Sequence, residues 1–300
     1  MRTNALRPAI RRNHWPTALS ILGLALGLPA CDEGMESGEP VVGVGQVWAY
    51  STRTEGVISA SYRSLLGKTI ATCPPSVAVS DNCIFSSCRF SRDALPVPVS
   101  AGVIGLSGLD AAVLLEPRAE PVDGTRYVTE ERGEPLFQGG ETVRFEVAGA
   151  GEVPAANGAV TAPEFLTVTA PVLPEPKAET EEEESEEEES ELSVLVNRTK
   201  AFKVAWTPLS TTGGLLVNAT LSARQEQDDE VVDYQYSCRA DGSTGEITLS
   251  PDVLKHLPVS SELSEVPRLY VGRDAITRVY GAWEHLFAVS ALDIFPLIIE

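Results

Sequence analysis

Apolar and polar residues alternate with a period of two along most of the chain after residue 41. Segments 142–147, 202–206, 215–222 and 231–238 show this most clearly, with apolar residues at every second position. Successive side chains of a β-strand point to opposite faces, so each segment is predicted to be a strand with one face on the core and one in water. Further strands are predicted at 41–50, 57–66, 84–90, 101–106, 112–116, 125–129, 165–170, 192–196, 246–249, 269–272, 276–280 and 286–292.

Turn-forming residue pairs separate these strands. Asn157-Gly158 and Asp241-Gly242 are typical of tight turns, and the second is interpreted as a hairpin turn rather than a calcium loop. Many short strands divided by turns predict an all-β fold, an antiparallel β-sandwich of immunoglobulin-like or jelly-roll-like type. One short helix is predicted at 251–257, with Ser250 as its N-cap and Pro258 following it.

The first 30 residues have the pattern of an export signal. Four arginines and no acidic residue give a cationic start, an unbroken apolar run follows at 17–28, and Ala30 places a small residue at the expected cleavage point. As a helix the apolar run would span only about 18 Å, which is short of the ~30 Å hydrocarbon core of a bilayer. We therefore expect residues 1–30 to be a cleaved signal rather than a transmembrane helix.

Leu28-Pro29-Ala30-Cys31 closes this signal and resembles the lipobox of bacterial lipoproteins. The resemblance implies cleavage before Cys31, a diacylglycerol group on its sulfur and a third fatty chain on the new N-terminus. Several acyl chains anchor a protein stably, whereas one chain binds only marginally. The membrane is then a partner through Cys31, and residues 31–40 form an acidic flexible tether. An ordinary secretory signal is the alternative, and the membrane and leaflet stay open.

The chain is strongly acidic, with a formal net charge of −20. Removal of the four leader arginines leaves 19 basic and 43 acidic residues, a net charge of −24. Such a surface repels nucleic acid, so no nucleic-acid partner is expected. Eleven glutamates lie in residues 175–191, and their mutual repulsion predicts a disordered acidic loop, 171–191, inserted into one β-sandwich domain that spans residues 41–300.

Four cysteines follow Cys31, namely Cys73, Cys83, Cys88 and Cys238. An even number in an exported chain favours two disulfides, for which three pairings are open. The preferred pairing is Cys83–Cys88 as a local link, with Cys73–Cys238 joining the first third of the chain to the last. A zinc site is disfavoured, because the spacing is not of the paired C-x2-C kind and no histidine is near in sequence.

Catalytic, cofactor-binding and metal-binding motifs are not apparent, and no cofactor is predicted. His256 is interpreted as a structural residue at the end of the short helix, and His285 as a partly exposed turn residue. Ser107 lacks the second glycine of a nucleophile elbow. Trp48, Trp206 and Trp283 are interpreted as core residues, with an exposed sugar-binding platform as the alternative.

Beyond the lipobox, the order of features resembles a set of uncharacterised bacterial lipoproteins of similar length. The resemblance implies a β-sandwich and no activity. We therefore expect a non-enzymatic structural or binding module of the cell envelope, with an outward-facing carbohydrate- or protein-binding adhesin as one alternative and an envelope hydrolase as another. The matching segments are Cys73…Cys83-x4-Cys88, 100–102, 136–141, 151–154, 168–171, 204–207 and Cys238.

Overall fold

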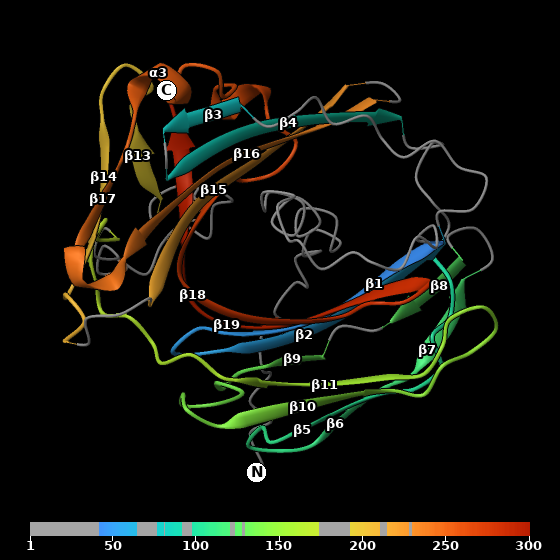
Figure 1. The fold of residues 1–300 in the computed structure, drawn as a ribbon. Coiled ribbons are helices and arrows are strands. Elements are labelled where there is room, and N and C mark those ends of the chain that lie inside the picture. Colours follow the sequence, from blue (N-terminus) through green and yellow to red (C-terminus); the bar gives the residue numbers. More distant parts are fainter. Residues whose placement is uncertain are drawn as a thin grey trace, which may run out of the picture.

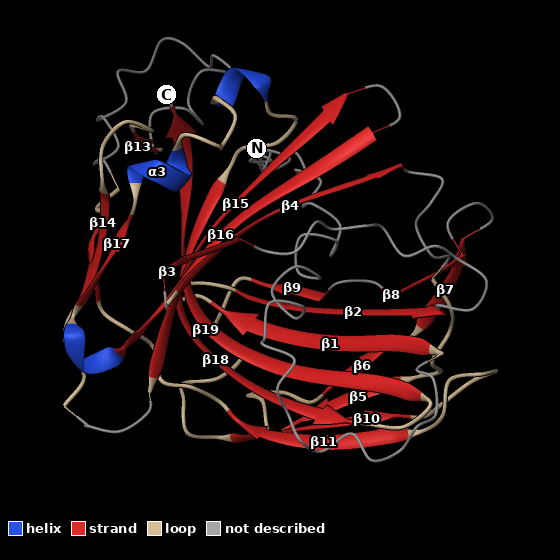
Figure 2. Cartoon of the chain, turned by 45° about the horizontal axis from the view of Figure 1, so that its top comes forward, coloured by secondary structure: helices blue, strands red, loops and turns tan. Residues whose placement is uncertain are grey.

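A computed structural model describes residues 42–64, 77–80, 82–91, 98–120, 124–127, 130–173, 193–210, 215–227 and 230–300. The predicted leader, the predicted acidic tether, Cys31 with its predicted lipid anchor, Cys73 and the glutamate run 175–191 all lie outside these residues. Strands dominate the described part, as Figures 1 and 2 show. The prediction of an all-β sandwich is confirmed.

One long sheet of ten strands organises the fold. Its strands run, in spatial order, β3 (Val77–Ser80), β4 (Cys83–Ser91), β16 (Glu230–Asp241), β15 (Leu216–Gln227), β18 (Arg268–Val279), β19 (Trp283–Ile299), β1 (Gly43–Ser51), β2 (Gly56–Ser64) and β9 (Glu130–Arg132). The tenth strand, β13 (Val194–Val196), pairs with the end of β19. The long sheet bends sharply, so that β4, β16 and β15 form one arm and β19, β1 and β2 the other (Figure 1).

Smaller sheets pack on the outside of this bend. The order of the four-stranded sheet is β11 (Ala156–Thr161), β10 (Thr142–Val147), β5 (Ile104–Ser107) and β6 (Val113–Leu115). The three-stranded sheet holds β12 (Val168–Ala170), β14 (Phe202–Trp206) and β17 (Glu246–Leu249), and β7 (Pro117–Glu120) pairs with β8 (Gly124–Tyr127). The four-stranded sheet covers the arm of β19 and β1, and the three-stranded sheet covers the arm of β15 and β16 (Figure 1).

Two hydrophobic cores fill the spaces between these layers. The first core packs Val47 and Phe287 of the long sheet against Phe145 of β10, and the second packs Leu221 against Val204 of β14. Strand β19 contributes to both, because its odd-numbered side chains enter the first core as far as Ala291 and the second core from Phe295 onward. We call this side of the long sheet its outer face and the opposite side its inner face.

The predicted alternation of buried and exposed strand residues is found in the structure, but the strand directions and one predicted turn differ from the prediction. Two pairs, β1–β19 and β13–β19, are parallel, so the sandwich is mixed rather than purely antiparallel. Asn157-Gly158 lies inside β11 and is not a turn, because Gly158 lets β11 approach the ring of Phe287, which an added Cβ would meet at 2.6 Å.

The short helix and the predicted hairpin turn are also changed in detail. Helix α3 (Pro251–Leu254) is shorter than predicted, although Ser250 caps it as expected. Asp241 begins a 3₁₀ turn, η3 (Gly242–Thr244), and its carboxylate accepts the backbone N–H of Ser243 at 2.8 Å. This turn leads from β16 to β17, which pairs with β14, so it is not a hairpin. A second 3₁₀ turn, η4 (Ser260–Glu262), precedes β18.

Segments 136–141 and 100–102 have structural roles. In segment 136–141, Leu136 and Phe137 are buried, and the Glu141 carboxylate accepts the backbone N–H groups of Gln138 and Gly139. Burial alone raises the pKa of Glu141, but these hydrogen bonds more than offset it and hold the pKa below its usual value. In segment 100–102, the Tyr127 hydroxyl accepts the backbone N–H of Ala101 and donates to the carbonyl oxygen of Gly102. Both segments therefore fix loops.

Candidate functional site

The inner face of β15 and β16 is polar over four successive cross-strand pairs. Side chains that face each other across this ladder are Asn218 and Arg239, Thr220 and Ser237, Ser222 and Gln235, and Arg224 and Asp233. The alternate pairs point to the outer face and belong to the second core, for example Leu221 and Tyr236. Although polar, Thr220, Arg224 and Gln235 are buried. The inner face is thus a built polar surface rather than an ordinary solvated one.

A continuous row of polar side chains crosses five strands of this face. We define the polar row as Arg239, Asn218, Asp274, Ser290 and Trp48, which lie on β16, β15, β18, β19 and β1. Arg239 Nε donates to Asn218 Oδ1 at 3.1 Å, and Asn218 Nδ2 donates to Asp274 Oδ2 at 2.5 Å. From the other side, Trp48 Nε1 donates to Ser290 Oγ at 2.9 Å, and the Ser290 hydroxyl bonds the Asp274 carboxylate.

Gly272 leaves the space that the hydrogen bond between Asn218 and Asp274 requires. Gly272 stands directly opposite Asn218 in the register, and a Cβ there would lie 2.1 Å from the backbone oxygen of Ala291. Because Gly272 has no side chain, Asn218 reaches diagonally to Asp274, two residues further along β18. The two halves of the row therefore converge on one carboxylate.

The Asp274 carboxylate is the electrostatic centre of the row. Burial raises its pKa above the usual value, while hydrogen bonds from Ser290 and Asn218 and the charge of Arg239 oppose that rise. Asn218 and Ser290 bond to the carboxylate, and Arg239 and Trp48 in turn donate to these two residues, so the carboxylate has a fixed orientation. Such pre-organised polar groups are characteristic of sites that recognise hydrogen-bonding ligands.

A buried ion pair extends the polar surface along the same two strands. Arg224 Nε and Nη2 donate to the two carboxylate oxygens of Asp233 at 2.7 and 3.2 Å, and Nη1 donates to Glu265 at 3.3 Å. Burial alone lowers the pKa of Arg224, but the hydrogen bonds and charge of Asp233 outweigh it and raise the pKa. The guanidinium is therefore charged and fixed in position.

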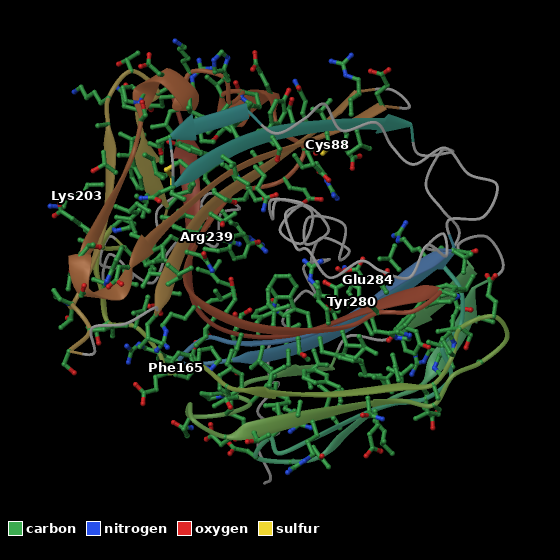
Figure 3. The ribbon with its side chains drawn as sticks, viewed as in Figure 1. Cys88, Phe165, Lys203, Arg239, Tyr280 and Glu284 are labelled. Atoms are coloured by element: carbon green, nitrogen blue, oxygen red, sulfur yellow. A yellow bond between two sulfur atoms is a disulfide. The ribbon has the colours of Figure 1, made fainter. Side chains whose placement is uncertain are left out.

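The opposite arm of the bend presents a mixed inner face. Trp48, Leu286 and Ala288 form a small apolar cluster with Tyr50 against it. Beside this cluster, Arg278 Nη1 donates to Glu284 at 2.8 Å. In Figure 3 Arg239 and Glu284 lie on the inner side of the two arms. Polar groups on one arm and aromatic groups on the other are suited to a ligand with both kinds of surface.

The histidines are placed differently from the sequence-based expectation. His285 lies in β19 and is 2 % exposed, so the prediction of a partly exposed turn residue is wrong. Its side chain lies between those of Trp283 and Phe287 on the outer face, and its Nδ1 lies 3.5 Å from the Tyr62 hydroxyl. His256 packs on Phe85 beside the second core, as the structural interpretation expected. The structure does not bring the two histidines together.

The tryptophans follow the core interpretation. Trp48, Trp206 and Trp283 are 5 %, 2 % and 2 % exposed, so an exposed sugar-binding platform made of these rings is wrong. Trp206 and Trp283 lie in the second and first cores, respectively. Trp48 differs, because its ring lies on the inner face and its Nε1 belongs to the polar row.

The preferred disulfide pairing is wrong. Cys83 bonds Cys238, because antiparallel register places them opposite each other on β4 and β16 with their Cα atoms 4.1 Å apart. Cys83 and Cys88 lie five residues apart on one extended strand, about 16 Å at ~3.3 Å per residue, and a disulfide needs Cα atoms within about 7 Å. Cys88 is disulfide-bonded to a cysteine outside the described residues.

An open groove lies on the outside of the four-stranded sheet. It has a volume of about 650 Å³, and its walls include Leu114, Arg144, Glu146 and Asn157. Its side chains form no buried polar constellation comparable to the polar row, so we treat the inner face as the candidate site.

No protein-family model matches the chain, and no curated protein matches it. Within the described residues, no helix has the length and hydrophobicity to cross a membrane, and no group of three or more His, Cys, Asp or Glu side chains is arranged to hold a metal ion. The resemblance to bacterial lipoproteins stays a prediction.

Sequence reasoning missed the polar row because its members come from five distant segments. The alternation correctly placed Asn218, Thr220, Gln235 and Ser237 on the face opposite the core. It did not predict that this polar face would be partly buried and hydrogen-bonded. A usable signal was the run of four polar residues at alternate positions in two neighbouring strands, since an ordinary solvated face carries more charge and fewer amides and hydroxyls.

Proposed function

We propose that this protein is a lipid-anchored lipoprotein of the cell envelope that acts as a non-enzymatic binding module. The anchor is Cys31, supported by the lipobox-like Leu28-Pro29-Ala30-Cys31. The binding surface is the inner face of the long sheet. One observation carries this second part: the polar row crosses five strands, and its two hydrogen-bonded halves, Arg239–Asn218 and Trp48–Ser290, meet at a single carboxylate, Asp274.

The chemistry of the inner face favours a hydroxyl-rich, uncharged ligand such as a glycan. Asn218, Ser222 and Ser237 are partly exposed and offer amide and hydroxyl groups that both donate and accept. The charged groups beside them occur as pairs, Arg224 with Asp233 and Arg278 with Glu284, so this face lacks the strong negative charge of the whole chain. A neutral polar ligand exchanges hydrogen bonds with water for hydrogen bonds with these groups without a large electrostatic penalty.

A surface-exposed carbohydrate-binding adhesin is the particular form of this function that the site favours most. An envelope hydrolase is less favoured, because the carboxylates on the inner face are held by arginine or by hydrogen bonds and the two histidines lie elsewhere. Asp274, with its raised pKa, is the side chain on which a hydrolase would depend.

The anchor is tested by the localisation of Cys31→Ala. We expect the wild-type protein in the membrane fraction, with a triacylated N-terminal peptide beginning at residue 31 in the mass spectrum. The variant should move to the soluble fraction. Membrane partitioning that is the same in both proteins would contradict the lipid anchor.

The binding surface is tested with the purified, non-lipidated protein on a glycan array. A bound glycan should be lost or weakened at least about tenfold by Asn218→Ala, because each hydrogen bond to a buried polar group contributes on the order of 1 kcal/mol or more and its removal also frees Asp274. Asn157→Ala is the matched control, because Asn157 is an exposed asparagine of β11 on the outside of the molecule. Equal binding by both variants would place the ligand elsewhere.

A further inference from the structure

The first described residues fix where the anchored chain enters the fold. The backbone N–H of Val42 donates to the carbonyl oxygen of Ala282 at 2.8 Å, and β1 begins at Gly43, opposite Trp283. Gly43 is needed there, since an added Cβ would lie 2.4 Å from the Trp283 ring. The chain that leads back to Cys31 therefore leaves the structure at the turn between β18 and β19.

That turn is exposed, uncharged and aromatic. It consists of Tyr280, Gly281 and Ala282, which are all exposed, and Tyr280 is 58 % exposed. The nearest charged side chains along the hairpin, Arg278 and Glu284, form an ion pair with each other. Tyr280 is the one aromatic residue among the large hydrophobic side chains that the described residues expose.

We propose that the β18–β19 turn is the membrane-facing end of the protein and that Tyr280 lies in the lipid headgroup region. This inference rests on the proposed lipid anchor at Cys31. Val42 is eleven positions after Cys31, so even a fully extended tether places the turn within about 40 Å of the lipidated sulfur. Tyrosine is favoured at the interface of a bilayer because its ring is apolar and its hydroxyl stays hydrated.

The absence of charge at this turn suits it to a membrane surface. The mature chain carries a net charge of −24, and anionic headgroups repel an acidic surface. A turn without charged residues, joined to an internally neutralised ion pair, avoids that repulsion. In Figure 1 the β18–β19 turn and the free end of the other arm, formed by β4, β15 and β16, extend to the same side of the molecule, away from the bend.

The test places a tryptophan at the turn and, as a control, at the far end. Tyr280→Trp reports on the turn, and Leu195→Trp reports on β13, where Leu195 is 55 % exposed beside the end of β19. The full-length lipidated proteins are reconstituted into vesicles of phosphatidylethanolamine and phosphatidylglycerol with brominated acyl chains. The fluorescence of the wild type, whose Trp48, Trp206 and Trp283 are buried, is subtracted.

We expect brominated lipid to reduce the fluorescence of Trp introduced at 280 and to leave that at 195 unchanged. Equal quenching at both positions, or none at 280 in protein that sediments with the vesicles, would overturn the orientation and leave the anchor standing. Protein that fails to sediment with the vesicles would overturn the anchor and this inference together.

A second measurement avoids any change in the turn. Tyrosine nitration by tetranitromethane should modify Tyr280 less in vesicle-bound wild type than in soluble Cys31→Ala. Equal nitration of the two proteins would contradict contact between the turn and the bilayer.

Discussion

Arg224 offers the most direct test of the buried polar inner face. Its side chain is 7 % exposed and makes two hydrogen bonds to Asp233 and one to Glu265. Replacing it by methionine keeps much of the packed stem but leaves two carboxylates without their cation. Breaking a fully buried pair costs about 3–5 kcal/mol.

The exposure of the partners reduces that figure. Asp233 and Glu265 are 19 % and 34 % exposed, so water partly solvates both carboxylates once the arginine is gone. We expect Arg224→Met to lower the free energy of unfolding by about 2–3 kcal/mol. For a chain of this size the melting temperature should fall by about 5–10 °C.

The matched control is Arg89→Met on the neighbouring strand β4. Arg89 pairs with Glu230 at 3.4 Å, but the two side chains are 68 % and 57 % exposed, and such a pair contributes only about 0–1 kcal/mol. Chemical denaturation of both variants by urea, followed by circular dichroism, gives the difference. Equal stabilities would refute the view that the inner-face network is buried and coupled.

Three further predictions follow from other parts of the fold. Gly45→Ala should destabilise by about 1–3 kcal/mol, because its Cβ would lie 2.0 Å from the Tyr62 ring, whereas Gly133→Ala, with nothing within 4 Å, should be close to neutral in the same urea titration. Burial lowers the pKa of His285, so the unfolded chain takes up a proton that the folded chain refuses; stability should therefore fall as pH drops below about 6.5, and His285→Phe should flatten that slope in melting curves from pH 7 to pH 5. If Cys31 is lipidated its sulfur cannot form a disulfide, so Cys88 must pair with Cys73; a Cys31–Cys88 peptide in the non-reduced digest would contradict both the pairing and the anchor.

The fold class could be predicted from the sequence because alternation is a local property. Val143, Phe145 and Val147 of β10 are buried as their pattern required, and so are Val217, Ala219 and Leu221 of β15. The length of β19 could not be predicted so easily, since its final residues pass from one core to the other and are apolar on both faces. His285 was wrongly predicted to be a turn residue. The sequence contained a clue to its strand position, because Trp283, His285 and Phe287 occupy alternate positions and so share one face.

The disulfide shows where local reasoning ends. The predicted strand 84–90 begins directly after Cys83 and contains Cys88, so an extended chain between the two cysteines already argued against their pairing. Identifying Cys238 as the partner required the register of β4 against β16, which are separated by more than a hundred residues. The polar row is harder still, because it depends on the register of five strands at once.

Stability alone does not account for the polar row. The outer face of the same strands shows that apolar pairs such as Leu221 and Tyr236 pack well there, and apolar replacements for buried polar groups are often neutral or stabilising. A row of hydrogen bonds that meets Asp274 from both sides instead fixes the position of one carboxylate and its neighbours to within hydrogen-bond tolerance. Because the polar row runs from β16 and β15 to β19 and β1, a ligand bound along it would contact both arms of the sheet and resist their separation. Ligand binding should therefore stabilise the whole folded chain rather than one arm of it.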